Sequence, residues 1–199
     1  FGNSWMDISS DDGHGIEKNS AQLIQRGEVT PSNLGYLSYP WSWYWQQITY
    51  CNRFFDNVSG DNLEALNNQD SDKVSRMIGE MKFLRAYSYF RLSAFYSGVP
   101  LVTSSFKLGD DFMVSRNSFE EILEFVTTEL DEAATLLPLK YNDSRDKGRI
   151  TRGAALAIKS RALLYAASPL FNPSNDRSKW QKAADAAKVV IDLDLYSLH

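Results

Sequence analysis

Apolar residues recur at alternating steps of three and four in several separate segments of this 199-residue chain. The first such segment begins at Trp41 and continues through Tyr44, Ile48, Cys51, Phe55 and Val58. This spacing places the side chains on one face of an α-helix. A second helix is predicted from about Asp72 to Tyr96, and because it is apolar on two sides we expect it to pack between neighbours.

Three more helices are predicted toward the C-terminus. Ser118-Phe119-Glu120-Glu121 has the Ser-x-x-Glu pattern of a capping box, and the helix that it begins ends before Pro138. Thr151 is expected to cap a fourth helix, and Ser178-Lys179-Trp180-Gln181 to begin a fifth that runs to about Asp192. The third and fourth helices begin about 34 residues apart, near the period of tetratricopeptide repeats. Few strand candidates remain, so the sequence predicts an all-α fold, a tetratricopeptide-like stack of antiparallel helix pairs.

Residues 1–40 differ from the rest of the chain. They are rich in Gly, Ser, Asn, Asp and Pro and show no sustained apolar period. We interpret them as a long N-terminal loop region that precedes a helical scaffold over residues 41–199, all within a single helical domain. Long loops are uncommon in compact domains unless they are functional, so this loop is the first candidate site.

Large aromatic side chains are concentrated where this loop meets the first helix. Seven lie within 15 residues: Tyr36, Tyr39, Trp41, Trp43, Tyr44, Trp45 and Tyr50. Rigid rings with polar handles suit ligand recognition, because they contribute contact area and lose little rotamer entropy. Core packing is favoured for Trp41 and Tyr44, which share the apolar stripe, whereas the loop residues leave both roles open. The candidate ligand-binding residues are Trp5, Tyr36, Tyr39, Trp41 and Trp43.

Charge and composition exclude several kinds of partner. The net charge of -4 and a pI near 5.2 give none of the clustered positive charge that nucleic acid requires. No uninterrupted apolar run reaches the roughly 18 residues of a membrane span. Cys51 is the only cysteine, so neither an intramolecular disulfide nor a structural zinc site is expected.

Catalytic patterns are missing as well. The only histidines are His14 in the loop and His199 at the end of the sequence, and neither is well placed for a catalytic triad. The spacings HExxH, CxxC, GxGxxG and GxxxxGK do not occur, so we expect no catalysis, no metal and no cofactor. The carboxylates of the third helix, Glu129 among them, are interpreted as mostly solvated surface. A basic cluster of Arg145, Lys147, Arg149 and Arg152 is either an anion-binding patch or, the favoured alternative, a set of ion pairs with a neighbouring helix.

Several blocks, read in chain order, resemble the SusD/RagB family of outer-membrane nutrient-binding lipoproteins of the starch-utilisation type. The blocks are Lys82 to Phe90, Tyr96 to Val102, Arg116 to Ile122, Glu129 to Ala134 with Leu137-Pro138, Gly148 to Ala155 and Arg161 to Asn172. The resemblance covers essentially residues 45 to 199. It implies a tetratricopeptide-like scaffold, lipid-anchored and exposed at the outer membrane of a Gram-negative bacterium.

The same resemblance implies a function. A family member of this kind captures oligo- or polysaccharide and passes it to a SusC-like TonB-dependent transporter, without cleaving a bond. Peptide binding and a helical protein–protein interaction scaffold without small ligand are the alternatives. Because family members are much longer, we expect this chain to be an N-terminal part of a longer protein whose lipid anchor lies outside it. The matching blocks are scaffold motifs, so the candidate aromatic residues depend on the loop argument alone.

Overall fold

The computed structural model of the chain describes residues 7, 9–11, 13 and 21–197. It divides into two compact units, Phe1–Trp43 and Tyr44–His199. The named elements are all helical, and the described residues contain a single isolated bridge, between Thr30 and Asn33, and no strand. The all-α prediction is therefore confirmed.

The first unit contains short helical elements. They are α2 (Ala21–Gln25), the 3₁₀ helix η1 (Gly35–Leu37) and the first turns of α3 (Ser38–Asn57). The helix predicted to begin at Trp41 thus begins at Ser38, whose hydroxyl donates to the carbonyl oxygen of Gly35 at 2.8 Å. Pro40 fits within this first turn because the N–H groups there have no partner inside the helix.

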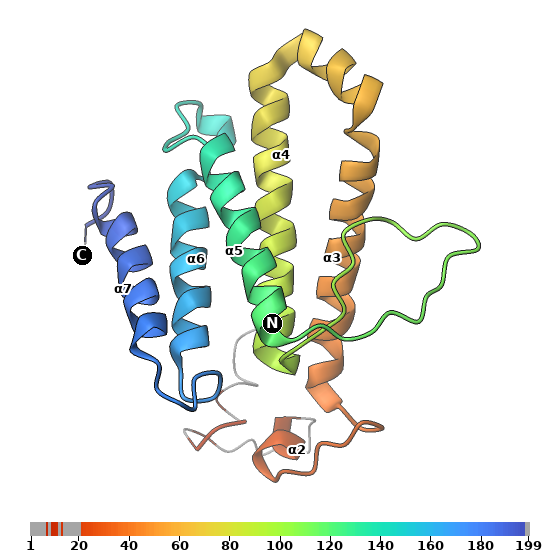
Figure 1. Ribbon diagram of the computed structural model, residues 1–199, viewed down its shortest axis with the longest axis vertical. Coiled ribbons are helices and arrows are strands. Elements are labelled where there is room, and N and C mark those ends of the chain that lie inside the picture. The colour runs from red at the N-terminus through yellow and green to blue at the C-terminus, as the bar shows by residue number, and fades with distance from the viewer. Residues whose placement is uncertain (1–6, 8, 12, 14–20, 198–199) are drawn as a thin grey trace. The chain divides into compact units, whose positions relative to one another are not determined.

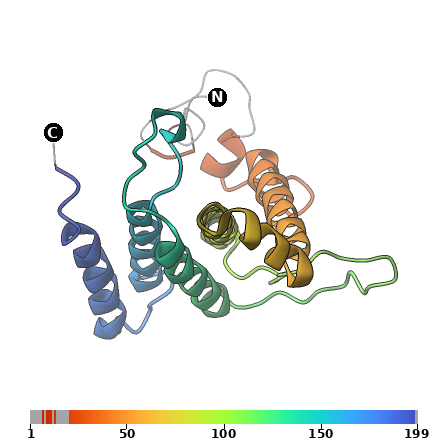
Figure 2. The ribbon, with the colours of Figure 1, turned by 90° about the horizontal axis from the view of Figure 1, so that it is seen from above.

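The second unit contains the rest of α3, the 3₁₀ helix η2 (Ser144–Asp146) and four further α-helices. These are α4 (Gly60–Tyr96), α5 (Phe119–Leu136), α6 (Arg152–Ala167) and α7 (Arg177–Ile191). Figures 1 and 2 both show α4, α5, α6 and α7 following one another side by side, joined by short connections and by one long one between α4 and α5. This order gives the predicted stack of antiparallel helix pairs.

Side chains from α3, α4, α5 and α6 fill the core of this unit. Fully buried members include Ile48, Leu92, Ile122, Leu130 and Ala162. Burying each large aliphatic side chain contributes about 1.5 to 3 kcal/mol. The contact between α3 and α4 includes an aromatic pair: the Trp45 and Tyr89 rings meet edge-on with centroids 6.0 Å apart.

Of the three helix starts predicted from capping residues, two are confirmed and one is wrong. Ser118 and Glu121 form the complete capping box of α5, and the Thr151 side chain caps α6. The cap of α7, however, is Asp176, whose carboxylate accepts from the N–H of Ser178 at 2.8 Å. Ser178 already lies inside the first turn, so it cannot be the capping residue that the sequence pattern suggested.

Helix α4 begins twelve residues earlier than the predicted Asp72. Its first part has little buried surface, and Asp70 then interrupts the helix with φ -162° and ψ 86°. The Asp70 carboxylate accepts from the N–H of Lys73 at 2.9 Å and so caps the part that follows. The apolar period could therefore locate only the second part, because the first has no packed face to produce a period.

A methyl group at Gly98 is predicted to destabilise the second unit. Gly98 is buried, and a Cβ there would overlap the backbone carbonyl oxygen of Asn117. Asn117 is itself fixed, since its N–H donates to Val99 at 3.0 Å. We expect Gly98→Ala to lower the free energy of unfolding, measured by urea denaturation, by about 2 to 3 kcal/mol.

Gly153→Ala is the matched control for this prediction. A Cβ at Gly153 would overlap the hydroxyl of Tyr196, a side chain that is 60% exposed and can turn away. The loss there should stay below about 1 kcal/mol, since alanine is also the better helix former. Equal stability losses for the two variants would contradict the prediction.

Candidate ligand-binding site

Three of the predicted aromatic residues come together at the start of α3. The ring centroids of Tyr36 and Tyr39 are 6.0 Å apart, and those of Tyr39 and Trp43 are 5.7 Å apart. Tyr39 and Trp43 are four residues apart and lie on one face of α3, and Tyr36 precedes them in η1. We name Tyr36, Tyr39 and Trp43 the aromatic ladder.

The ladder presents much of its ring surface to solvent. Tyr39 is 51% exposed and Trp43 is 61% exposed. Exposed large rings that touch one another are unusual for a purely structural role, because packing would bury them. Flat apolar faces of this kind can stack against the C–H face of a pyranose ring or against an apolar side chain of a peptide.

The other two predicted residues are not brought into the ladder. Trp41 lies two positions after Tyr39 and therefore on another face of α3, with 36% of its surface exposed. Trp5 lies outside the described residues. The structure thus groups three of the five candidates.

Two neighbouring rings turn toward the core of the second unit. Tyr44 packs edge-on against Tyr87 with centroids 6.3 Å apart, and its hydroxyl accepts from the guanidinium of Arg91 at 3.2 Å. Trp45 packs against Tyr89 in the same unit. Tyr44 is therefore a packing residue, as its stripe predicted, and Trp45 is one although it lies off that stripe.

A buried polar network joins α3, α4 and α5. Arg85 is 6% exposed and Glu129 is 5% exposed, and the guanidinium donates to the carboxylate at 2.9 Å. Lys82 donates to the second oxygen of Glu129 at 2.8 Å. The Phe55 ring covers the guanidinium, with 4.2 Å between the guanidinium carbon and the ring centroid. Glu129, predicted to lie on a solvated face, is instead the acceptor at the centre of this network.

The network also fixes the strap, which we define as residues 99–105 after α4. Arg85 donates to the carbonyl oxygen of Thr103 at 3.2 Å, and Asn52 donates to that of Val102 at 2.9 Å. The Tyr89 hydroxyl donates to the same Val102 oxygen at 2.7 Å. Because side chains satisfy this backbone, the strap is ordered without belonging to a helix or strand.

Two ionisable groups in or beside the network, Lys82 and Cys51, have shifted pKa values. Burial disfavours the charge of Lys82, but hydrogen bonds to Glu129 and Glu132 outweigh it and raise the pKa of this ammonium. Burial raises the pKa of the Cys51 thiol to about 11. A thiol with so high a pKa holds almost no thiolate at neutral pH and is a poor nucleophile. The charged groups of the network, Lys82, Arg85 and Glu129, are thus paired with one another.

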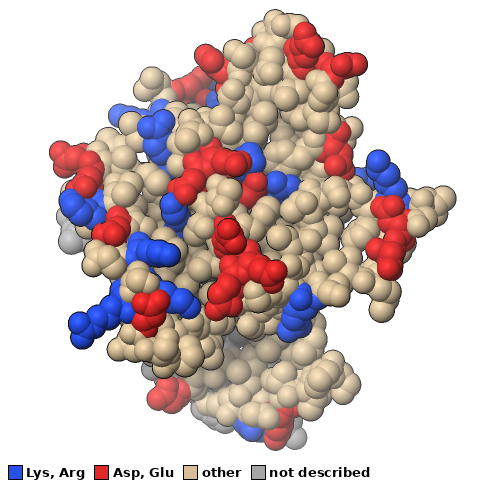
Figure 3. Space-filling model, in the orientation of Figure 1, with Lys and Arg blue, Asp and Glu red and all other residues tan. Residues whose placement is uncertain are grey.

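Most of the predicted basic cluster is paired. Arg149 contacts Glu80 at 3.0 Å and Asp146 at 2.7 Å, and these hydrogen bonds raise the pKa of its guanidinium. The guanidinium of Arg152 donates to the carbonyl oxygen of Ala134 at 2.8 Å. The favoured interpretation, ion pairing with the neighbouring helix, is confirmed for Arg149. On the face shown in Figure 3, basic and acidic side chains are likewise intermixed.

The described residues provide neither a metal-ligating group of three side chains nor a membrane-spanning helix. Nowhere in this part of the chain do three metal-ligating side chains form a group. No described helix combines the length and apolarity that crossing a membrane requires.

Comparison with known proteins identifies the family. Residues 3–164 match the model of a SusD-like family described as starch-binding and associating with the outer membrane. The chain belongs to this family. The resemblance seen in the sequence blocks is thereby confirmed.

Individual relatives support the assignment. A SusD-like protein of Bacteroides ovatus is 27% identical over 128 residues, which cover 64% of this chain and 22% of that protein. A SusD-like carbohydrate-binding protein of Bacteroides fragilis has a crystal structure similar to this chain, with TM-score 0.75, 28% identity and coverage of 94% of this chain and 34% of that one. A crystal structure with xylogluco-oligosaccharide shows the same fold at TM-score 0.76 and 23% identity, over 99% of this chain and 38% of that one. The chain therefore spans less than two fifths of each of these proteins.

Proposed function

We propose that this SusD-like chain is part of a glycan-binding protein that captures oligo- or polysaccharide through the aromatic ladder. The observation that carries the proposal is the contact of Tyr36, Tyr39 and Trp43 at the start of α3, where the rings of Tyr39 and Trp43 are exposed. Membership of a family described as starch-binding supports it, as does the similarity to a carbohydrate-binding protein at 28% identity. Trp41 and Trp5 are proposed as further ligand contacts.

The proposal extends to the place of the whole protein in uptake. Such a protein would be lipid-anchored at the outer membrane, through an anchor outside this chain, and exposed at the surface of a Gram-negative bacterium. It would pass the captured glycan to a SusC-like TonB-dependent transporter and would cleave no bond. The paired polar network of the second unit is consistent with a scaffold that holds a binding surface.

Affinity electrophoresis of the full-length protein in gels that contain a panel of neutral and acidic polysaccharides tests this function. We expect retardation by at least one glycan and no release of reducing sugar from any. Binding of peptides without retardation by any glycan would instead support the peptide-binding alternative. Capture of the transporter without either ligand would support a pure interaction scaffold.

A further inference from the structure

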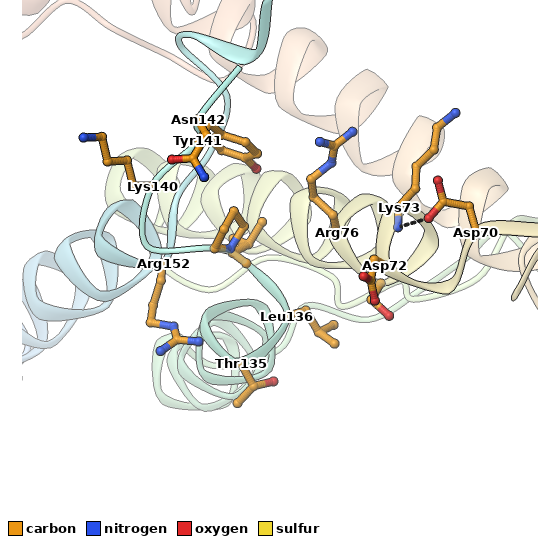
Figure 4. Close-up of a pocket in the computed structure, with 13 residues that line it drawn as sticks. Asp70, Asp72, Lys73, Arg76, Thr135, Leu136, Lys140, Tyr141, Asn142 and Arg152 are labelled. Carbon is orange, nitrogen blue, oxygen red and sulfur yellow. Dashed lines mark hydrogen bonds between the residues drawn. The ribbon is translucent and has the colours of Figure 1, made fainter. Parts of the chain in front are cut away.

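A hollow of about 630 Å³ lies where the second part of α4 meets the end of α5 and the segment that leads to α6. Figure 4 shows Lys73 and Arg76 on the α4 side, and Lys140, Tyr141 and Asn142 on the connecting segment. All of these residues belong to the second unit. The hollow contains no residue of the aromatic ladder.

The lining carries a local excess of positive charge. Its basic residues are Lys73, Arg76, Lys140 and Arg152, and its acidic residues are Asp70 and Asp72. Asp146 also contacts Arg76, so four positive and three negative groups leave one positive charge, whereas the whole chain has a net charge of -4. The hollow therefore reverses the sign of the chain's overall charge and should attract anions.

The cations of the hollow are only partly paired. Among the described residues, the ammonium groups of Lys73 and Lys140 have no ion pair or hydrogen bond. Arg76 contacts Asp146 at 3.3 Å and lies over the Tyr141 ring, with 5.7 Å between the guanidinium carbon and the ring centroid. Its Nε atom is buried and has no hydrogen-bond partner in this part of the structure. Arg76 thus contacts one carboxylate, whereas the guanidinium of Arg149 contacts two.

The arrangement indicates an extended ligand with hydroxyl groups as well as charge. Arg76 lies between Lys73 and Lys140, which extend to opposite sides (Figure 4). Repeated anionic groups along one chain match such a row better than a single small anion does. Ser75 and Asn142 add polar side chains that make no hydrogen bond to another described residue. Sugar hydroxyls can use these groups.

We infer that this hollow binds the carboxylate or sulfate groups of an acidic glycan, with Lys73, Arg76 and Lys140 as the recognising cations. The inference rests on the proposed glycan-binding function. It adds to the aromatic ladder a second binding surface, which recognises the charge of the glycan. Lys and Arg attract an anionic group at a distance, so selection here depends on ionic strength. Stacking on the ladder depends on it far less.

The test uses the full-length protein and matched pairs of oligosaccharides. An oligogalacturonate is compared with its methyl ester, and a sulfated galactan oligomer with its desulfated form. We expect Lys73→Gln/Lys140→Gln to weaken binding of the acidic members by about tenfold at low salt and to leave the neutral members unchanged. Lys107→Gln/Lys147→Gln removes the same charge from two exposed lysines outside the hollow and should change neither.

Several outcomes would overturn the inference. Equal affinity of both double variants for the acidic oligomers would do so, as would equal affinity of the unmodified protein for the acidic and neutral members of both pairs. Loss of binding to phosphatidylglycerol vesicles in the Lys73/Lys140 variant, with acidic oligomers unaffected, would assign the hollow to lipid headgroups instead. In each of these cases retained binding of a neutral glycan leaves the proposed function intact. Failure of the unmodified protein to bind any glycan would overturn the proposed function and this inference together.

Discussion

Replacement of Arg85 by methionine is expected to lower the free energy of unfolding by about 3 to 5 kcal/mol, the usual cost of breaking a buried ion pair. The substitution leaves Glu129, which is 5% exposed, with Lys82 as its remaining cation. It also removes the donors to Asn52 and to the carbonyl oxygen of Thr103, so the strap loses one of its anchors. Urea denaturation followed by far-UV circular dichroism measures the loss.

A double variant separates two contributions to stability: the cost of leaving one buried charge unpaired and the net contribution of the intact ion pair. Arg85→Met/Glu129→Leu removes both partners, and well-packed apolar replacements of buried pairs are often close to neutral. We therefore expect it to recover much of the stability that Arg85→Met loses. Arg145→Met is the matched control, because Arg145 pairs with Asp143 while its side chain is 88% exposed, and no measurable change is expected.

Two other stability results would contradict this explanation. If the double variant were as unstable as Arg85→Met, the hydrogen bonds from Arg85 to α3 and the strap would carry the stability instead of the charge pair. If Arg85→Met were as stable as the unmodified chain, the buried network would have no structural role. In that case another explanation would be needed for two charged side chains in the core.

The helices of the second unit could be predicted because their packed faces leave a period in the sequence. Capping residues also located the start of a helix, as at Ser118, where both hydrogen bonds of the capping box form. The first part of α4 could not be found this way, since residues 60–69 bury little surface and have no apolar stripe. The start of α7 was misplaced for a related reason, because Asp176 and Ser178 are both good capping residues and sequence alone does not choose between them.

The candidate site was only partly predictable. A concentration of rings at the loop–helix junction marked Tyr36, Tyr39 and Trp43 as candidates, but it could not show that these three contact one another or separate them from Trp41. Glu129 was misplaced because the carboxylates that follow it, Asp131 and Glu132, are exposed, and the sequence pattern grouped it with them. Its burial depends on Arg85, which is 44 residues away and reaches it only through packing of α4 on α5. The Arg85–Glu129 pair could have been found from one signal in the sequence. Each residue is charged and lies on the face of its helix that packs against the other helix.

The aromatic ladder makes the most direct prediction about function. Tyr39→Ala/Trp43→Ala is expected to weaken binding of the preferred glycan by about a hundredfold, since each stacking ring contributes roughly 1 to 2 kcal/mol and a factor of ten corresponds to 1.4 kcal/mol. Because Tyr39 is 51% exposed and Trp43 is 61% exposed, their removal should leave the fold largely intact. Isothermal titration calorimetry with the glycan selected from the panel measures the affinity.

Conservative and distant substitutions distinguish stacking from general damage. Trp43→Phe keeps a flat ring at the same place and should retain most of the affinity, whereas Trp43→Ala should not. Trp180→Ala removes a tryptophan of α7 that is 40% exposed and lies outside the ladder, so it should have no effect on binding. Unchanged affinity in a correctly folded Tyr39→Ala/Trp43→Ala variant would show that these rings do not contact the glycan. The ligand site would then have to be sought elsewhere in the protein, because no other pair of exposed rings at the start of α3 is in contact among the residues described.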